Sequence, residues 1–397
     1  MHRIQSGDKI RVLRLLSRMN VGGPSRHVVH LAKELSLMGY ETRLLVGIPE
    51  SDEGSMVRLA EKAGVSFSVV ADLDRPISML RDFKAFKDIV RHIYLFKPHI
   101  VHTHTTKVGI LGRMAAIFCG VPVIFHTFHG HVFSGYFSEN TSRFVVALER
   151  ILARFTDRII TLTDGLKQDI AERFGVTERQ NIDVVPLGLD LSKNLNRVRN
   201  SSGWRKCLAL DSEVFLAGIV ARLVPVKNHA MLIGAVAKVV KEIPNFHLAV
   251  IGGGELEAAL RALAASLGVA GHVHFCGIVD EIEDVYADLN LLILSSKNEG
   301  TPVVLIEAVA SGCPVAATKV GGIPEVLENG KYGFMLDSVP ELFAEQLAKA
   351  VRACSDIAAF SSGDRQRFAA NYSVAALAKR TDSLYRKSLK LRGINIE

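Results

Sequence analysis

The sequence predicts two consecutive α/β domains, each built around a doubly wound parallel sheet and facing a common cleft. Short apolar runs of strand length alternate with longer amphipathic segments along the chain. This alternation is typical of parallel strands whose connecting helices cover both faces of a sheet. The pattern breaks once, near residues 186–202, where proline, glycine, asparagine and serine replace the apolar periodicity. With 397 residues, 48% of them hydrophobic, the chain can form two sizeable cores.

The first series of elements predicts an N-terminal Rossmann-like domain over residues 1–190. Strands are expected at residues 11–16, 42–46, 67–70, 100–102, 123–127, 158–161 and 182–185. Helical patterns lie between them at residues 26–38, 80–94, 110–118 and 142–155.

The second series predicts a C-terminal Rossmann-like domain over residues 206–372, after a linker at 191–205. The last segment, 373–397, is expected to be a helix that crosses back to the first domain. Strands are expected at residues 214–220, 247–251, 273–276, 289–294, 315–317 and 333–336. Helical patterns lie at residues 230–241, 256–267, 303–310, 342–353 and 374–391.

The charge of the chain is uneven. The net charge is +7, and residues 1–199 hold 28 Lys and Arg against 20 Asp and Glu. A basic half indicates an ordinary solvated surface, a phosphorylated ligand, anionic lipid or nucleic acid. We expect no nucleic-acid partner, because no basic motif interleaved with aromatic residues occurs.

The cysteines and the apolar runs indicate a cytoplasmic protein. The five cysteines are scattered and form no CxxC pair, which is typical of reduced thiols. Residues 1–7 are polar and form no signal peptide. The apolar run at 108–128 is broken by Arg113 and Pro122, so it predicts a helix, a turn and a strand, not a membrane span. Any contact with an anionic membrane is therefore expected to be peripheral, on the inner face of the plasma membrane.

Two carboxylates stand eight positions apart in Glu299-Gly-Thr-Pro-Val-Val-Leu-Ile-Glu307. Thr301, Pro302 and Val303 are expected to open a helix whose first backbone N–H groups can hold a phosphate. Glu307 would follow one to two turns into this helix, and Glu299 would stay on the loop. On spacing alone, a helix-capping acid beside a surface glutamate remains an alternative.

The surrounding motifs favour a ligand-binding site over a helix-capping acid beside a surface glutamate. Arg222 and Lys227 follow a predicted strand in Ala-Arg-Leu-Val-Pro-Val-Lys, and a glycine turn, Gly252-Gly253-Gly254, follows the next strand. Downstream of Glu307 the chain continues through Ser-Gly-Cys-Pro-Val and Val-Gly-Gly-Ile-Pro-Glu. Together these motifs closely resemble the C-terminal domain of the retaining glycosyltransferase family 4, with its E-x7-E motif and its Arg-x4-Lys pair. The resemblance covers most of residues 210–340.

The resemblance implies a GT-B fold in which the N-terminal domain binds the acceptor and the C-terminal domain binds the nucleotide-sugar donor, at a site without a metal or other cofactor. Arg222 and Lys227 would bind the donor diphosphate, Glu307 the ribose and Glu299 the hydroxyls of the donor sugar. A fixed Arg and Lys can stabilise the charge of a leaving nucleoside diphosphate. Gly253 and Gly254 would lie near the nucleotide, since glycine lets the backbone approach a ligand closely. The sequence departs from the family at Asn228, where glycine is usual, and at Thr301-Pro302, where Phe-Gly is usual.

The first half contributes a glycine turn and a histidine. Gly22 and Gly23 follow the first strand, where they resemble the family's glycine-rich loop facing the diphosphate and the acceptor. His129, at the end of another strand, resembles the active-site histidine that contacts the donor sugar. The neighbouring histidines could suggest a metal site, but no nearby carboxylate or cysteine completes a ligand set. The segment 128–138 is similar to a subset of bacterial surface-polysaccharide enzymes.

The sequence therefore predicts a retaining glycosyltransferase. Its partners would be a nucleotide-sugar donor, a UDP-sugar by family habit, and a glycan or lipid-linked saccharide acceptor, in the synthesis of exopolysaccharide, O-antigen or capsule. Closure of the two domains would exclude water from the site. A nucleotide-sugar epimerase, which would need no acceptor, and a non-catalytic nucleotide-sugar-binding protein are the alternatives.

Overall fold

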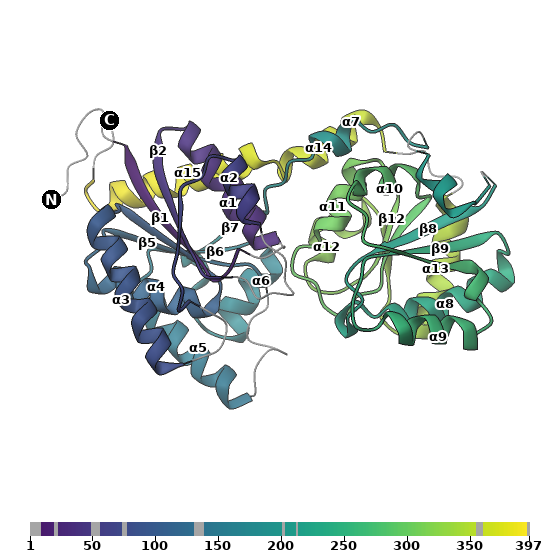
Figure 1. Ribbon diagram of the computed structural model, residues 1–397, viewed down its shortest axis with the longest axis horizontal. Coiled ribbons are helices and arrows are strands. Elements are labelled where there is room, and N and C mark those ends of the chain that lie inside the picture. Colours follow the sequence, from purple (N-terminus) through teal and green to yellow (C-terminus); the bar gives the residue numbers. More distant parts are fainter. Residues whose placement is uncertain are drawn as a thin grey trace. The chain divides into compact units, whose positions relative to one another are not determined.

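Two compact units make up the chain in the computed structural model (Figure 1). Unit 1 comprises Met1–Leu189 and Tyr372–Glu397, and unit 2 comprises Asp190–Asn371. The structure describes residues 9–19, 23–48, 56–73, 78–130, 139–200, 203–211, 213–354 and 360–394.

The sheet of unit 1 is parallel throughout, with the order β3-β2-β1-β4-β5-β6-β7 in the described residues. The direction of winding reverses between β1 and β4, which creates a crevice at the carboxyl ends of these two strands. The strands are β1 (Ile10–Leu16), β2 (Tyr40–Val46), β3 (Phe67–Val69), β4 (Ile100–His104), β5 (Val123–Phe128), β6 (Arg158–Thr161) and β7 (Ile182–Val184).

Helices cover both faces of this sheet. One apolar core joins α1 and α15 to β1, β4 and β5, and a second joins α3 and α4 to the opposite face. The last helix, α15, thus packs on unit 1 although it follows unit 2 in the chain (Figure 1). The helices are α1 (Gly23–Leu37), α2 (Val57–Lys62), α3 (Met79–Phe96), α4 (Thr106–Phe118), α5 (Glu139–Ala153), α6 (Asp164–Gln168), η1 (Asp169–Arg173), η2 (Arg179–Asn181) and α15 (Val374–Leu391).

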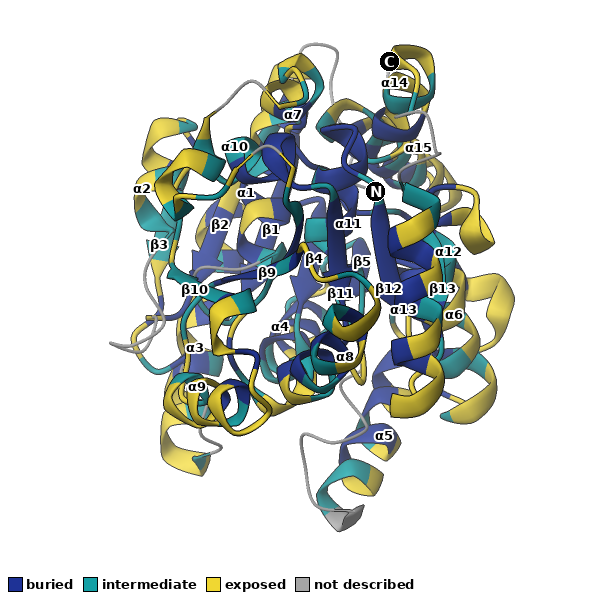
Figure 2. Ribbon diagram, turned by 90° about the vertical axis from the view of Figure 1, so that its right-hand side faces the viewer, coloured by how far each residue is buried: buried dark blue, intermediate teal, exposed yellow. Residues whose placement is uncertain are grey.

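The sheet of unit 2 is also parallel, with the order β10-β9-β8-β11-β12-β13 in the described part of the chain. Here the winding reverses between β8 and β11. Figure 2 shows strands such as β11 and β12 fully buried, whereas the outer face of α9 is exposed. The strands are β8 (Phe215–Val220), β9 (Phe246–Ile251), β10 (Val273–Gly277), β11 (Leu291–Leu294), β12 (Val315–Thr318) and β13 (Phe334–Leu336).

The helices of unit 2 lie in two layers. Helices α8, α9 and α13 cover one face of the sheet, and α10, α11 and α12 lie on the other (Figure 1). The helices are α7 (Ser192–Asn196), η3 (Trp204–Leu208), η4 (Pro225–Lys227), α8 (His229–Glu242), α9 (Glu257–Ser266), η5 (Ala270–His272), α10 (Ile282–Asp288), α11 (Val303–Ala310), α12 (Ile323–Val326), η6 (Glu328–Gly330), α13 (Pro340–Cys354) and α14 (Ser362–Asn371).

The stretch 191–205, expected to be a linker, is instead built into unit 2. The amide of Asn194 donates to Ser311 Oγ at 3.0 Å, and the guanidinium of Arg199 donates to the carbonyl oxygen of Tyr286 at 2.7 Å. The linker prediction was wrong because polar residues without apolar periodicity can also be fixed by hydrogen bonds to the backbone of a neighbouring helix. In the described ranges no helix combines the length and the apolar character needed to cross a membrane.

Candidate functional site

The charged residues predicted in the second half gather where the winding of the unit 2 sheet reverses. Lys227 ends the loop after β8, and Glu299 lies on the loop after β11. Ligands of open α/β sheets bind outside the carboxyl ends of the strands at such a reversal. The fold therefore places both residues at its most favourable binding position.

Lys227 and Glu299 form an ion pair. Lys227 Nζ lies 2.5 Å from Glu299 Oε1, and the side chains are 22% and 10% exposed. Ser296 Oγ donates to the same carboxylate oxygen at 2.6 Å. Both of these bonds fall on Oε1, and neither engages Oε2. Partial burial strengthens such a charge-assisted contact relative to an exposed ion pair.

A glycine pair holds the backbone of Glu299. Gly322 N–H donates to the carbonyl oxygen of Glu299 at 3.1 Å. At Gly321, whose φ is +53°, an added Cβ would lie 1.9 Å from the same oxygen. No residue with a side chain fits so close to this carbonyl oxygen. The Val-Gly-Gly motif therefore fixes the backbone of Glu299 and, through it, the position of the carboxylate.

The loop of Lys227 is tied to the loop of Glu299. Ser295 Oγ donates to the carbonyl oxygen of Lys227 at 2.9 Å, and Lys297 N–H donates to that of Val226 at 2.8 Å. Asn228 has a left-handed backbone, with φ +53° and ψ +41°. Asparagine and glycine both adopt this conformation at little cost, so the departure from Lys-Gly leaves the turn intact. Arg222 lies exposed on the same loop.

The glycine turn after β9 packs against the loop after β8. A Cβ at Gly252 would lie 2.1 Å from the carbonyl oxygen of Ala221, and one at Gly254 would lie 2.6 Å from that of Leu223. Gly253 accepts a hydrogen bond from Leu223 N–H at 3.0 Å. Two of the three glycines thus allow close packing between neighbouring loops. This packing accounts for Gly252 and Gly254 without a ligand. The role of Gly253 and Gly254 in donor binding therefore stays a prediction.

Helix α11 begins at Val303, the first residue of the predicted helix 303–310, so that Thr301 and Pro302 directly precede it. Pro302 lies at the N-cap, with φ −75° and ψ +95°, and Val303 is the first helical residue. Thr301, just before it, has a buried hydroxyl oxygen without a hydrogen-bond partner among the described residues. A polar atom of this kind costs free energy unless a ligand or water meets it.

Glu307 is the fifth residue of α11, just over one turn in. The phenolic O–H of Tyr286 donates to Glu307 Oε2 at 2.9 Å. Burial, followed by the neighbouring carboxylate, raises the pKa of Tyr286 well above its usual value. The phenol therefore stays protonated and fixes one oxygen of Glu307. We call Arg222, Lys227, Glu299 and Glu307 the charged edge of unit 2.

In unit 1 the predicted His129 follows β5 and meets a second histidine. His104, the last residue of β4, places Nδ1 3.0 Å from His129 Nε2. The ring of His27, on α1, meets His129 edge-on at 5.1 Å between centroids. His129 Nδ1 is buried and has no partner in the described part of the chain. The strand ends thus hold His129 by one nitrogen and leave the other for a ligand.

A buried polar chain continues behind this pair. His102 stacks on His104 at 4.4 Å, accepts or donates at Nδ1 with Tyr385 Oη at 2.5 Å, and contacts Thr127 Oγ1 through Nε2 at 2.7 Å. Arg14, which is fully buried, donates to Tyr385 Oη at 3.3 Å. Helix α15 therefore joins the site through Tyr385.

These histidines are held neutral. Burial lowers the pKa of His129 to about 4. Four other histidines also have pKa values well below the usual value for histidine, and burial is the largest cause in each. These four are His27, His102, His104 and His126. We call the five residues the histidine edge of unit 1.

The remaining predicted residues of unit 1 are placed only in part. Gly23 is the first residue of α1 and has open space where a Cβ would be, whereas Gly22 lies outside the described residues. In the part of the chain that the structure describes, no three His, Cys, Asp or Glu side chains are arranged to hold a metal ion.

Several site residues were missed by the sequence motifs. They are Ser296 and Tyr286, which bond the two glutamates, and Arg14 and Tyr385, which bond the histidine chain. Ser296 stands three residues before Glu299, a spacing that could have suggested the bond. The other contacts join residues far apart in the chain, and no local signal indicates them.

Comparison with known proteins agrees with this architecture. The model for glycosyl transferases group 1 matches residues 201–367, and the model for glycosyltransferase family 4 matches residues 21–193. An Escherichia coli protein, UDP-Gal:alpha-D-GlcNAc-diphosphoundecaprenol alpha-1,3-galactosyltransferase, is 29% identical over 68% of this chain and 70% of its own length. D-inositol 3-phosphate glycosyltransferase of Thermobispora bispora is 26% identical over 94% of this chain and 91% of its own.

The fold is shared with a solved structure as well. The crystal structure of Alr3699/HepE of Anabaena in complex with UDP-glucose covers 94% of this chain and 99% of its own, with a TM-score of 0.77 and 22% identity. Two Rossmann-like units of this kind define the class of GT-B glycosyltransferases. Within that class, the chain belongs to the group 1 glycosyltransferases of family 4.

Proposed function

We propose that the chain transfers a sugar from a UDP-sugar to a glycan or lipid-linked saccharide, with retention of the anomeric configuration. The observation that carries this proposal is the Lys227–Glu299 ion pair at the reversal point of the unit 2 sheet. The proposal draws on the UDP-sugar and lipid-linked acceptor in the name of the Escherichia coli relative.

The charged edge suits the departure of a nucleoside diphosphate. Charge develops on the diphosphate as the glycosidic bond breaks, and Lys227 and Arg222 are the cations that would stabilise it. The pairing of Lys227 with Glu299 holds the ammonium group in place before the donor binds. Preorganised charge of this kind lowers the barrier without reorganisation during the reaction.

The two glutamates would bind different parts of the donor. Glu299 Oε1 is occupied by Lys227 and Ser296, so Oε2 would accept bonds from sugar hydroxyls. Glu307, steadied by Tyr286, would accept bonds from the ribose hydroxyls. The buried hydroxyl of Thr301 and the start of α11 would face the diphosphate, as helix N-termini favour anions.

The reaction needs no carboxylate nucleophile in this scheme. Glu299 is engaged by a lysine, and His129 is kept neutral by burial, with Nδ1 available to a sugar hydroxyl. We therefore propose attack by the acceptor on the same face that the diphosphate leaves, through an oxocarbenium-like state. The anomeric configuration of the product, read by NMR, tests retention.

The acceptor and the cellular setting complete the proposal. A lipid-linked acceptor would bring the enzyme to the inner face of the plasma membrane as a peripheral protein, in the synthesis of surface polysaccharide. No metal is proposed for catalysis, because Arg222 and Lys227 supply the positive charge. A thermal-shift screen of UDP-, GDP- and ADP-sugars identifies the nucleotide, since a ligand that binds only the folded state raises Tm.

The test is transfer from the UDP-sugar identified in that screen by Lys227→Ala and Glu299→Ala. We expect kcat to fall by about a hundredfold or more in each, the scale of losing one preorganised charge. Lys349→Ala and Glu345→Ala break an exposed ion pair in the same unit and should leave kcat unchanged. Near-wild-type rates in both site variants would refute the site, and release of epimerised sugar without acceptor would indicate an epimerase.

A further inference from the structure

A buried arginine lies behind the histidine edge of unit 1. Arg14, in β1, is fully buried. Its Nη2 donates to Tyr385 Oη at 3.3 Å, whereas Nε and Nη1 have no hydrogen-bond partner in the described part of the chain. A guanidinium stays charged in proteins, and a buried charge is usually paired with a carboxylate. Among the described side chains, this cation instead has a phenol as its hydrogen-bond partner.

Arg14 fixes the direction of the hydrogen bonds that follow it. Arginine can only donate, so Tyr385 Oη accepts from Arg14, and the phenolic O–H needs an acceptor of its own. Within the described ranges that acceptor is His102 Nδ1, at 2.5 Å. The proton of the neutral imidazole therefore lies on Nε2, which donates to Thr127 Oγ1 at 2.7 Å. An imidazolium, with a proton on both nitrogens, would leave the phenolic O–H without an acceptor.

The ring of His102 supports the two histidines that end the strands. It stacks on His104 with the centroids 4.4 Å apart and the planes 27° apart. His104 Nδ1 in turn lies 3.0 Å from His129 Nε2, while His104 Nε2 has no partner among the described residues. The orientation of His104 thus depends on the stack on one side and on His129 on the other. A His102 ring that turned would remove one of these two supports.

The charge of Arg14 favours the same state of His102 as its hydrogen bond does. Burial, followed by Arg14, lowers the pKa of His102 well below its usual value. Burial also raises the pKa of the Tyr385 phenol, against the opposing charge of Arg14. The phenol therefore keeps the O–H that His102 Nδ1 accepts.

We propose that Tyr385 and Arg14 are positioning residues of the transfer reaction, which fix His102 as the tautomer with its proton on Nε2 and so hold the rings of His104 and His129. Both are fully buried and act through the histidines, not on the substrate. The last helix, α15, would thus contribute to the reaction through one hydroxyl group. The inference rests on the proposed function, because it assigns the histidine edge a part in sugar transfer.

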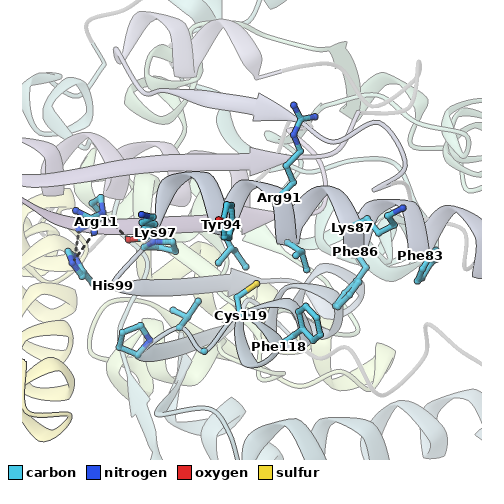
Figure 3. Close-up of a pocket in the computed structure, with 16 residues that line it drawn as sticks. Arg11, Phe83, Phe86, Lys87, Arg91, Tyr94, Lys97, His99, Phe118 and Cys119 are labelled. Atoms are coloured by element: carbon cyan, nitrogen blue, oxygen red, sulfur yellow. Dashed lines mark hydrogen bonds between the residues drawn. The ribbon is translucent and has the colours of Figure 1, made fainter. Parts of the chain in front are cut away.

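Two neighbouring contacts provide matched controls. Tyr40, in β2, donates to Asp382 Oδ1 of α15 at 2.7 Å, and its ring lies 6.1 Å from that of Tyr385. Tyr40→Phe therefore removes a phenolic O–H from the packing of the same helix. At the amino ends of β1 and β4, Arg11 Nη2 lies 3.3 Å from His99 Nε2, a second arginine–histidine pair on these strands (Figure 3). Arg11→Met removes that cation, away from the histidine edge.

The test combines NMR of the full chain, with isotope-labelled histidine nitrogens, and transfer kinetics. His102, assigned as the signal that His102→Asn lacks, should carry its proton on Nε2 alone in the wild type. In Tyr385→Phe the ring stays and Nδ1 loses its donor, so the proton should distribute over both nitrogens. We expect kcat to fall about tenfold and the KM for the UDP-sugar to change less than about twofold, because orientation is lost while unit 2 still binds the donor. Tyr40→Phe should keep the wild-type tautomer and kcat.

Arg14→Met tests the same step from β1. Without the guanidinium, Tyr385 Oη can accept from a proton on His102 Nδ1, so the tautomers should again mix and kcat should fall. Arg11→Met should behave as wild type. The other histidine signals of the same spectra show whether each variant is folded.

Three outcomes decide between this proposal and its alternatives. A wild-type proton on His102 Nδ1, or an unchanged tautomer in both Tyr385→Phe and Arg14→Met, would overturn it. Equal losses of kcat in Tyr385→Phe and Tyr40→Phe would also overturn it, in favour of simple packing of α15. A wild-type chain that transfers no sugar would refute the proposed function, whereas mixed tautomers in Tyr385→Phe would still establish that Tyr385 orients His102.

Discussion

The carboxyl ends of the two sheets carry opposite kinds of polar group. In unit 2 the charged edge keeps an ion pair between Lys227 and Glu299 and leaves Arg222 exposed. In unit 1 the histidine edge buries its rings, and burial keeps them neutral. The two units share the same fold and the same kind of strand reversal. The charged edge of unit 2 nevertheless bears charge, whereas the histidine edge of unit 1 forms hydrogen bonds between neutral groups.

This difference corresponds to two needs of a group-transfer reaction. A leaving diphosphate needs fixed positive charge, which unit 2 supplies through Lys227, paired with Glu299, and the exposed Arg222. A sugar hydroxyl needs a directed hydrogen bond, which a neutral histidine held at one nitrogen can give. The contrast makes the protonation state of the histidine edge, and the rigidity of the charged edge, the two properties most open to test.

The largest effect is expected from pH. Folding lowers the pKa values of four fully buried histidines from about 6.5, the value in the unfolded chain. At any pH between the folded and the unfolded pKa, the unfolded chain therefore binds more protons than the folded chain. Stability is therefore complete above about pH 6.5 and is lost as pH falls toward the folded pKa. At pH 5, His129, whose pKa in the folded chain is about 4, should by itself cost unit 1 roughly 2 kcal/mol of stability, and the four buried histidines should add to this loss. Hydrogen exchange of β4 and β5, corrected for intrinsic rates, measures the loss between pH 7 and 5.

Unit 2 provides the internal control for this prediction. Its single tryptophan, Trp204, reports the urea unfolding of that unit by fluorescence. Burial lowers the pKa of His229, which is buried, to about 4, and it also lowers the pKa values of His247 and His274, which are partly exposed. We expect unit 2 to lose clearly less stability than unit 1. Equal losses in the two units would show that the contrast between the edges is not one of proton affinity.

The next effect concerns the glycine that holds Glu299. Gly321→Ala would place Cβ 1.9 Å from the carbonyl oxygen of Glu299 and require alanine at φ +53°. The clash and the left-handed backbone should destabilise unit 2 by about 2 kcal/mol or more. Because the displaced segment carries Glu299, kcat should fall as well. Urea unfolding followed by Trp204 fluorescence gives the first value, and UDP release gives the second.

The matched control is another glycine of unit 2. Gly234 lies within α8, where no atom comes within 4 Å of an added Cβ and φ is not positive. Gly234→Ala should therefore stabilise unit 2 by up to about 1 kcal/mol, because alanine favours a helix interior. Wild-type stability and kcat in Gly321→Ala would mean that the loop adapts and that the charged edge is not rigid.

The sequence predicted the elements well because their signals are local. Apolar runs and glycine turns located each strand that bears the site, and the E-x7-E spacing put Glu299 on a loop and Glu307 in the helix. Contacts between strands have no such signal. Arg14 lies in β1, an interior strand where an apolar residue is expected, and it is fully buried against Tyr385, 371 residues away. The bond between His104 and His129 depends on the pairing of β4 with β5.

The smallest effect is expected from that bond between two histidines. His104 fixes His129 Nε2 at 3.0 Å and so directs Nδ1 toward a ligand. His104→Ala should lower kcat about tenfold, with little change in KM for the donor, because orientation is lost while the ring remains. Asparagine places a polar atom near the position of Nδ1, so His104→Asn should recover most of the rate.

A similar pair in unit 2 distinguishes positioning from packing. His247 Nδ1 lies 2.8 Å from His274 Nε2, on strands away from the charged edge. His247→Ala removes a ring from a comparable contact and should leave kcat unchanged. If both alanine variants lowered kcat alike, or if His104→Asn behaved as His104→Ala, the effect would be one of lost packing. Recovery in His104→Asn alone would show that a single hydrogen bond orients the neutral edge, as the ion pair orients the charged one.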